Sequence, residues 1–149
     1  MIRTAKVEDI DQVLALLKDF ARASLLKYDD WTPADEKVAK QKLLHLILHE
    51  YLIVAVKDDK IIGTIGASRE QDTWISNKVR MRELFWWVDP AFRRSRLSAE
   101  LYIRWEQDTN RWLASGKIHQ VSLSTQPGSS DLDLGKRGWK CVETHWIRG

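Results

Sequence analysis

The sequence predicts an α/β (α+β) fold in which a mixed, mainly antiparallel sheet of about six to seven strands is flanked by helices on both faces. Three observations lead to this prediction. Segments with helical periodicity alternate with short β-rich segments along the 149 residues. Two β-rich segments are separated only by a polar turn at Lys57-Asp58-Asp59, which predicts an antiparallel hairpin. After residue 80, a strand, a long helix and another strand follow one another, which predicts a parallel crossover.

Helices are predicted where apolar residues recur at spacings of three and four. The first such stretch starts at Val7, and its apolar stripe consists of Ile10, Val13, Leu14, Leu17, Phe20, Ala21 and Leu25. The second starts at Thr32, a favourable N-cap residue followed by proline, and extends to about His49. The third precedes Gly116, a helix-ending residue, and its apolar side carries Leu97, Leu101, Trp105 and Trp112.

Six segments are typical of strands because they are rich in β-branched and aromatic residues. They span residues 1–6, 51–56, 60–68, 80–88, 117–125 and 139–147. The polar stretch 70–78 contains an isolated Trp74 and predicts a loop or a frayed strand end. The turn-rich stretch 126–138 predicts at most one helical turn, around 130–136.

Length and composition favour a single domain over residues 1–149. The net charge of +3 is mild, which argues against a nucleic-acid partner. The single Cys141 excludes an intrachain disulfide and favours a reducing, cytoplasmic compartment. The N-terminus is charged from residue 3, so no signal peptide is expected, and no apolar run reaches the roughly 20 residues of a membrane span. Eight tryptophans favour a homodimer.

The most informative stretch joins a strand to the long helix. The apolar residues 83–88 lead into a turn at Asp89 and Pro90. Four cationic or hydroxyl side chains follow at the helix start: Arg93, Arg94, Ser95 and Arg96. The first amides of a helix have no intrahelical partner, and the helix dipole adds positive potential there. This stretch therefore predicts a phosphate site, with a solvated basic turn as the alternative.

The element order and these residues resemble the GNAT superfamily of acyl-CoA-dependent N-acyltransferases. The resemblance covers nearly the whole chain. It is carried by IRTAKVEDID at the start, IVAVKDDKIIGTIGAS in the hairpin, WVDPAFRRSRLSAELY in the strand–turn–helix unit, and GKIHQVSLST and KRGWKCVET toward the end.

The family's phosphate loop has Arg or Gln, two variable residues, Gly, one variable residue, and Gly or Ala. Arg93 matches the first position, whereas Arg96 and Ser98 stand where the family has its small residues. The family often has a Tyr before its final Lys-x-Gly-Phe-like segment, and residues 134–139 contain none. The first departure bears on how deeply the cofactor docks. The second bears on the source of the proton for the departing thiolate.

The resemblance implies acetyl-CoA as co-substrate and an amine as acceptor. A bulge in the fourth strand would open a gap beside the fifth strand, where pantetheine would pair with the backbone of Trp87 and Val88. The amide near Val88 would polarise the thioester carbonyl. Glu83 would act as general base, with Asp89 as a weaker choice. The remaining cofactor contacts are expected from Arg93, Arg94, Ser95, Arg96, Leu97, Ser98, Ser124 and Thr125.

Other interpretations stay open at this point. Glu83 could form a salt bridge with Arg80 or Arg82 instead of acting as a base. The replaced glycines and the missing Tyr are also consistent with a GNAT-fold module that binds CoA or a protein without acetyl transfer. A basic nucleic-acid-binding module is the third possibility. His45 and His49 lie four residues apart, but the inner Glu of a zinc-hydrolase helix is absent, so no metal site is predicted.

Overall fold

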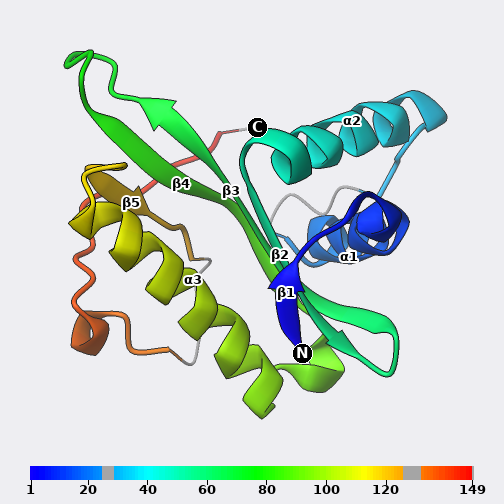
Figure 1. Cartoon of the computed structure of the whole chain (residues 1–149). Coiled ribbons are helices and arrows are strands. Elements are labelled where there is room, and N and C mark those ends of the chain that lie inside the picture. Colours follow the sequence, from blue (N-terminus) through cyan, green and yellow to red (C-terminus); the bar gives the residue numbers. More distant parts are fainter. Residues whose placement is uncertain (25–28, 126–131, 149) are drawn as a thin grey trace.

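The computed structural model describes residues 1–24, 29–125 and 132–148. It contains one five-stranded sheet in the order β1-β2-β3-β4-β5 (Figure 1). The strands are β1 (Ile2–Thr4), β2 (Tyr51–Lys57), β3 (Lys60–Gln71), β4 (Val79–Val88) and β5 (Gln120–Ser122). β1 to β4 pair antiparallel and β5 joins β4 in parallel. The mixed, mainly antiparallel sheet is confirmed, but among the described residues it has five strands instead of six to seven.

Helices cover both faces of this sheet, as predicted (Figure 1). On one face lie α1 (Ile10–Ala23), which follows the 3-10 turn η1 (Val7–Asp9), and α2 (Pro33–His49). On the other face lies α3 (Arg96–Ala114). The expected apolar side of α3 is confirmed, because Leu97, Leu101, Trp105 and Trp112 all pack in the cluster between α3 and the sheet. Leu25, expected at the end of the first stripe, is outside the described residues.

Two local sequence signals form the predicted structures. Thr32 accepts a hydrogen bond from the Asp35 amide at 3.2 Å, and the Asp35 carboxylate accepts one from the Thr32 amide at 2.9 Å. This reciprocal capping box starts α2. Asp58 and Asp59 adopt positive φ angles of 50° and 59° in the β2–β3 turn. Asp tolerates this left-handed conformation better than most residues, and the conformation matches the twist of a hairpin.

β4 contains the expected bulge. Gly66 of β3 lies opposite Phe85, and the next residue, Ala67, lies opposite Glu83. Leu84 is therefore an extra residue in β4, and the alternation of side chains between the two faces changes there. The Phe85 ring covers Gly66 so closely that a Cβ atom on Gly66 would lie 2.2 Å from the ring. A glycine is needed at this position.

Two strand predictions need correction. The segment expected to pair over 117–125 does so only at Gln120–Ser122. Residues 139–147 form no strand, and Val142 and Trp146 are 79% and 91% exposed. A strand needs both a partner edge and a face to bury. The neighbouring edge is three residues long, and Val142, Trp146 and Ile147 of this segment are exposed. In contrast, β3 extends beyond its expected end, to Gln71.

Candidate active site

The parallel pairing between β4 and β5 ends at the bulged region. Three residue pairs connect the strands: Arg80 with Gln120, Met81 with Val121, and Arg82 with Ser122. Beyond them, the Ser124 amide donates a hydrogen bond to Oε2 of Glu83 at 3.1 Å. A side-chain carboxylate thus takes the place of the next backbone acceptor. The last backbone pair between β4 and β5 is therefore Arg82 with Ser122, and Glu83 is the first residue of β4 beyond it.

Glu83 lies on the α3 face of the sheet, opposite Ala67, and is only 8% exposed. Burial raises the pKa of Glu83 to about 7, against the smaller opposing effects of the Ser124 hydrogen bond and the charge of Arg82. A carboxyl group with this pKa can accept a proton near neutral pH, which an ordinary glutamate does poorly. The arrangement can therefore perform general-base chemistry.

The salt-bridge interpretation of Glu83 is wrong. The Arg80 Nε atom donates to Oε1 of Gln120 at 2.7 Å. Arg82 pairs with Glu70 across the β3–β4 ladder, at 3.0 Å. Both guanidinium groups are engaged elsewhere, so the ionised form of Glu83 has no direct counter-ion among the described residues.

The turn after β4 is built by two side-chain caps. Asp89 accepts a hydrogen bond from the Ala91 amide at 3.0 Å and starts the 3-10 turn η2 (Pro90–Phe92). Ser95 is the N-cap of α3, and its Oγ accepts from the Ser98 amide at 3.2 Å. Asp89 thus has a structural role in the turn. Its alternative assignment as a base gains no support from this geometry.

The caps determine which amides an anion could use. The Ser95 amide donates to the Phe92 carbonyl and the Ser98 amide to Ser95, so two of the expected donors are already used. The amides of Arg96 and Leu97, the first two residues of α3, make no hydrogen bond among the described residues. These two amides fit a phosphate group at the helix N-terminus.

The arginines of the turn have different surroundings. Arg93 lies back along β4, where its Nε donates to the Val88 carbonyl at 3.2 Å and its guanidinium stacks over the Trp87 ring at 4.3 Å. Arg96 points outward with a 93% exposed side chain and pairs with Glu100 at 2.7 Å. Arg94 is exposed in the same turn. The turn is cationic as predicted, but Arg93 and Arg96 do not share one partner.

Val88 presents its backbone to the open side of β4. The Asp89 amide donates to Ile62 of β3 at 2.8 Å. In an antiparallel ladder, successive residues direct their peptide groups to opposite sides. Trp87 therefore faces β3, whereas Val88 faces away from it, where Arg93 reaches its carbonyl. The two tryptophans before Val88 also separate: Trp86 packs against Tyr102 and Trp87 against Phe20.

Ser124 and Thr125 follow β5 and are exposed. The Ser124 amide is committed to Glu83, which brings the end of this segment beside the carboxylate. Thr125 is the last described residue before 132. Of the expected pantetheine partners beyond β5, Ser124 is thus the one that contacts Glu83.

A polar cluster near the end of the chain was not predicted from the sequence. The Trp139 indole donates to the Tyr102 hydroxyl at 2.7 Å, and that hydroxyl bonds Oε1 of Glu106 at 3.1 Å. Arg137 pairs with Glu106 and stacks on the Tyr102 ring. The cluster fixes the 135–139 segment, which includes the 3-10 turn η3 (Gly135–Arg137), onto α3. Tyr102 follows Leu101 in the apolar pattern, so no local signal pointed to this polar role.

A family model described as the acetyltransferase (GNAT) family matches residues 11–128. The chain belongs to the GNAT acetyltransferase family. The fold, the bulged β4 and the helix N-terminus after it agree with that assignment. Enzymes of this family use acetyl-CoA as co-substrate, as expected from the sequence.

Solved structures support the same fold. A possible acetyltransferase from Clostridium difficile 630 has a TM-score of 0.67 at 17% identity, covering 100% of this chain and 96% of the other. A predicted acetyltransferase with acetyl-CoA from Clostridium acetobutylicum has a TM-score of 0.70 at 14% identity, with 99% and 94% covered. An aminoglycoside acetyltransferase from an uncultured soil metagenomic sample, in complex with sisomicin, has a TM-score of 0.64 at 15% identity, with 100% and 93% covered. No curated protein matches the chain.

Membrane spans and metal clusters are both absent from residues 1–24, 29–125 and 132–148. No helix there is both long and apolar enough to cross a membrane. No group of three or more His, Cys, Asp or Glu residues in these ranges could hold a metal ion. His45 and His49 do stack, with ring centroids 5.2 Å apart.

Proposed function

We propose that this GNAT-family chain is an acetyl-CoA-dependent N-acetyltransferase whose acceptor is a primary amine of a small molecule or protein. The observation that carries this proposal is the buried Glu83, which lies where β4 and β5 stop pairing and has its pKa raised to about 7. An amine attacks only after losing a proton, so a base that is ionised near neutral pH is what the reaction requires.

In the proposed reaction, Glu83 removes a proton from the acceptor ammonium, directly or through water. The amine nitrogen then attacks the thioester carbonyl carbon. The new C–N bond forms, the C–S bond breaks, and the electron pair leaves on the CoA sulfur. The nitrogen loses its second proton to solvent as the amide forms, and the sulfur takes a proton from solvent or a nearby side chain. The Val88 amide, on the open side of β4, would stabilise negative charge on the carbonyl oxygen.

The amides of Arg96 and Leu97 are the proposed pyrophosphate donors, and Arg93, Arg94 and Arg96 add positive charge. Ser95 contributes as the cap that orients these amides, and Ser98 as the residue it fixes. The backbone of Val88 is better oriented toward pantetheine than that of Trp87. Ser124 and Thr125 would contact pantetheine from the side of β5.

The proposal is tested by following CoA release spectrophotometrically with a panel of polyamines, aminoglycosides and peptides. Aminoglycosides belong in the panel because one structural neighbour was solved with sisomicin. Cys141 is exposed and would itself react with the thiol reagent that detects CoA. The assay is therefore also run with a Cys141→Ser variant, which removes this background signal. Turnover with at least one amine is expected. Bound acetyl-CoA without CoA release for any amine would contradict the proposal.

The second candidate is CoA binding without acetyl transfer. It is favoured by Arg96 and Ser98 in positions where the family has small residues, and by the absence of a Tyr from residues 134–139, where the family often has its proton donor. Calorimetry with acetyl-CoA, performed alongside the turnover assay, distinguishes the two. Charge reversal of Arg93 and Arg96 should weaken binding in both cases. Unchanged affinity would place the cofactor elsewhere.

Three broader expectations also remain proposals. The described elements share one sheet, which supports a single domain over residues 1–149. The exposed Val142, Trp146 and Ile147 support a homodimer, because large exposed apolar side chains often mark interfaces. Sedimentation of the wild type and of a Trp146→Ser variant would test it. The exposed thiol of Cys141 fits the cytoplasm.

A further inference from the structure

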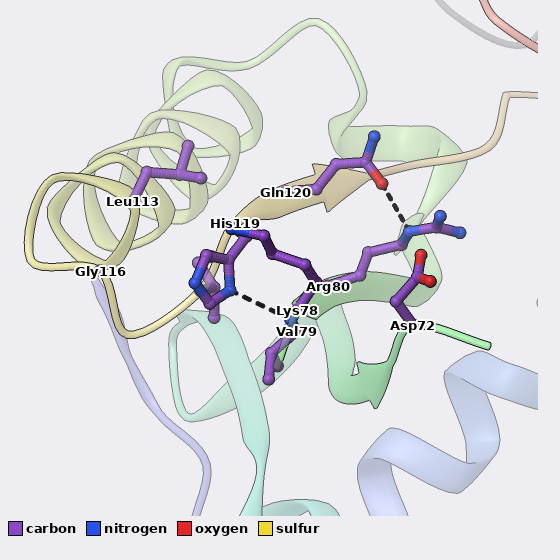
Figure 2. Close-up of a pocket in the computed structure, with 9 residues that line it drawn as sticks. Asp72, Lys78, Val79, Arg80, Leu113, Gly116, His119 and Gln120 are labelled. Carbon is purple, nitrogen blue, oxygen red and sulfur yellow. Dashed lines mark hydrogen bonds between the residues drawn. The ribbon is translucent and has the colours of Figure 1, made fainter. Parts of the chain in front are cut away.

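Side chains join β5 to β4 at both ends of their short pairing, which consists of only three residue pairs. Before β5 begins, the Val79 amide donates to Nδ1 of His119 at 3.0 Å (Figure 2). After β5 ends, the Ser124 amide donates to Oε2 of Glu83 at 3.1 Å. The two contacts differ in chemistry, because a neutral imidazole nitrogen accepts the first bond and a carboxyl group accepts the second. The second contact therefore involves the proposed base itself.

The two carboxylate oxygens of Glu83 have different surroundings. Oε2 accepts the Ser124 amide, whereas Oε1 makes no hydrogen bond within the described part of the chain. In that part, the buried polar atoms without a partner are the indole nitrogens of Trp31, Trp87 and Trp105. Oε1 is not one of them, so it reaches the solvent although the residue as a whole is buried. One oxygen is therefore held by the backbone of residue 124, and the other is open to a ligand or a water molecule.

The orientation of the Glu83 carboxylate depends on this one amide. The last torsion of a glutamate side chain has only weak preferences of its own, so a hydrogen bond decides how the carboxylate plane is turned. Among residues 1–24, 29–125 and 132–148, Ser124 is the only donor to Glu83. Arg82 acts on Glu83 through its charge, but its guanidinium is paired with Glu70. A backbone group 41 positions along the chain thus sets the direction of the carboxylate.

We infer that the backbone amide of Ser124 is the positioning group of the proposed base. It holds Oε2 and leaves Oε1 as the oxygen that removes the proton from the acceptor ammonium, directly or through water. The N–H bond of the ammonium breaks, an O–H bond forms at Oε1, and this proton passes to solvent after the product leaves. The role as a positioning group rests on the proposed acetyl transfer, whereas the contact itself does not.

The same hydrogen bond also favours the ionised form of Glu83. It opposes the effect of burial, and so keeps the pKa of Glu83 lower than burial alone would. Removing the amide hydrogen should therefore change both the orientation of the carboxylate and its pKa. A test has to separate these two effects.

The test compares two variants at position 124. Ser124→Pro removes the amide hydrogen and Ser124→Ala keeps it, and both lose the hydroxyl, so their comparison isolates the amide. The titration of Glu83 is followed by ¹³C NMR of the full chain labelled at the glutamate carboxyl carbons, and Glu83→Gln identifies the signal. The pKa of Glu83 should be about one pH unit higher in Ser124→Pro than in Ser124→Ala. Thr125→Pro places a proline where no hydrogen bond among the described residues is lost, and should leave this pKa unchanged.

Activity at high pH then isolates the orientation. At pH 9, Glu83 is largely ionised in both variants at position 124, so a remaining difference in kcat does not come from its protonation. For the amine found in the panel, kcat at pH 9 should be about 10- to 100-fold lower in Ser124→Pro than in Ser124→Ala, because a misplaced group loses rate even in the correct protonation state.

A measurement on the wild type keeps the test valid if the proline variant does not fold. In ¹H–¹⁵N spectra recorded between pH 5 and pH 9, the Ser124 amide proton should shift with the same midpoint as the Glu83 carboxyl carbon. The Thr125 amide should follow this titration much less. In Glu83→Gln, the titration of the Ser124 amide should disappear.

Several results would overturn the inference. A Ser124 amide that does not follow the titration of Glu83 would show that the contact is absent. Equal kcat at pH 9 in the two variants at position 124 would show that the amide does not orient the base, and a change confined to KM for acetyl-CoA would assign it to cofactor binding instead. Wild-type protein without turnover would overturn the proposed function as well, and this failure is distinguishable because the titrations of Ser124 and Glu83 would still coincide.

Discussion

Glu83→Gln should abolish most of the proposed acetyl-transfer activity while making the protein more stable at high pH. In the native state, burial moves the pKa of Glu83 from its ordinary value of 4.5 to about 7. One pKa unit corresponds to about 1.36 kcal/mol. Keeping Glu83 ionised in the folded protein therefore costs on the order of 3 kcal/mol, taken over the full change in pKa.

The sign follows from proton binding. Between pH 4.5 and about 7, the unfolded chain has released the Glu83 proton and the native protein has kept it. The native state binds more protons in this window, so its stability falls as pH rises through it. In Glu83→Gln, the substituted side chain never ionises, and its amide oxygen can still accept the Ser124 hydrogen bond. The variant should match the wild type to within about 1 kcal/mol at pH 5 and exceed its free energy of unfolding by about 3 kcal/mol at pH 8.

Urea denaturation followed by tryptophan fluorescence at pH 5 and pH 8 measures the stability difference. The activity arm is kcat/KM for the amine found in the panel, which should fall about 100- to 10,000-fold on loss of a general base. Wild-type kcat/KM should also fall about tenfold per pH unit below pH 7. Glu8→Gln, at an exposed carboxylate of η1, is the control and should show neither effect. A variant that is equally destabilised at both pH values, or that retains wild-type kcat/KM, would refute the reasoning.

Three further predictions concern the scaffold, and urea denaturation measures each. Gly66→Ala places a methyl group 2.2 Å from the Phe85 ring and should cost about 1–3 kcal/mol; a double-mutant cycle with Phe85→Leu should show coupling, and additive effects would contradict the clash. Asp108→Asn removes the charge of a carboxylate that is 4% exposed and accepts hydrogen bonds from one tyrosine and two arginines. The free energy of unfolding should fall by about 3–5 kcal/mol. In the control Glu100→Gln, at the exposed pair with Arg96, it should fall by less than about 1 kcal/mol. Thr32→Ala removes the α2 cap and should cost about 1 kcal/mol; no loss would show that the cap is dispensable.

Sequence reasoning succeeded where short-range chemistry decides the structure. The N-cap at Thr32 and the turn at Asp58 and Asp59 depend on residues within a few positions of one another, and both form as predicted. The expected strand over 139–147 failed because its composition fits a strand but no edge or face is available to it. The composition of a segment indicates whether it can adopt a strand conformation. Whether it pairs depends on a free strand edge elsewhere in the fold.

The candidate site depends on this second, non-local kind of information. The sequence identified Glu83 as a titratable residue on β4, but its environment is set by burial under the rest of the fold and by Ser124, which lies 41 positions later. Its alternative partners Arg80 and Arg82 lie within three positions of it on the same strand, and the fold directs both to other acceptors. No spacing rule within β4 distinguishes these outcomes.

The bulge at Leu84 explains why the pattern of β4 could not be assigned to faces. In a regular strand, Glu83 and Phe85 would share one face because side chains alternate with a period of two. The extra residue separates them: Glu83 joins Ala67 on the α3 face, and Phe85 packs with the cluster beneath α1 and α2. With this inserted residue, Glu83 lies on the α3 face next to the last β4–β5 residue pair, and Phe85 lies in the cluster beneath α1 and α2. The Phe85 ring lies directly over Gly66, so the strand residue opposite the bulge must be a glycine.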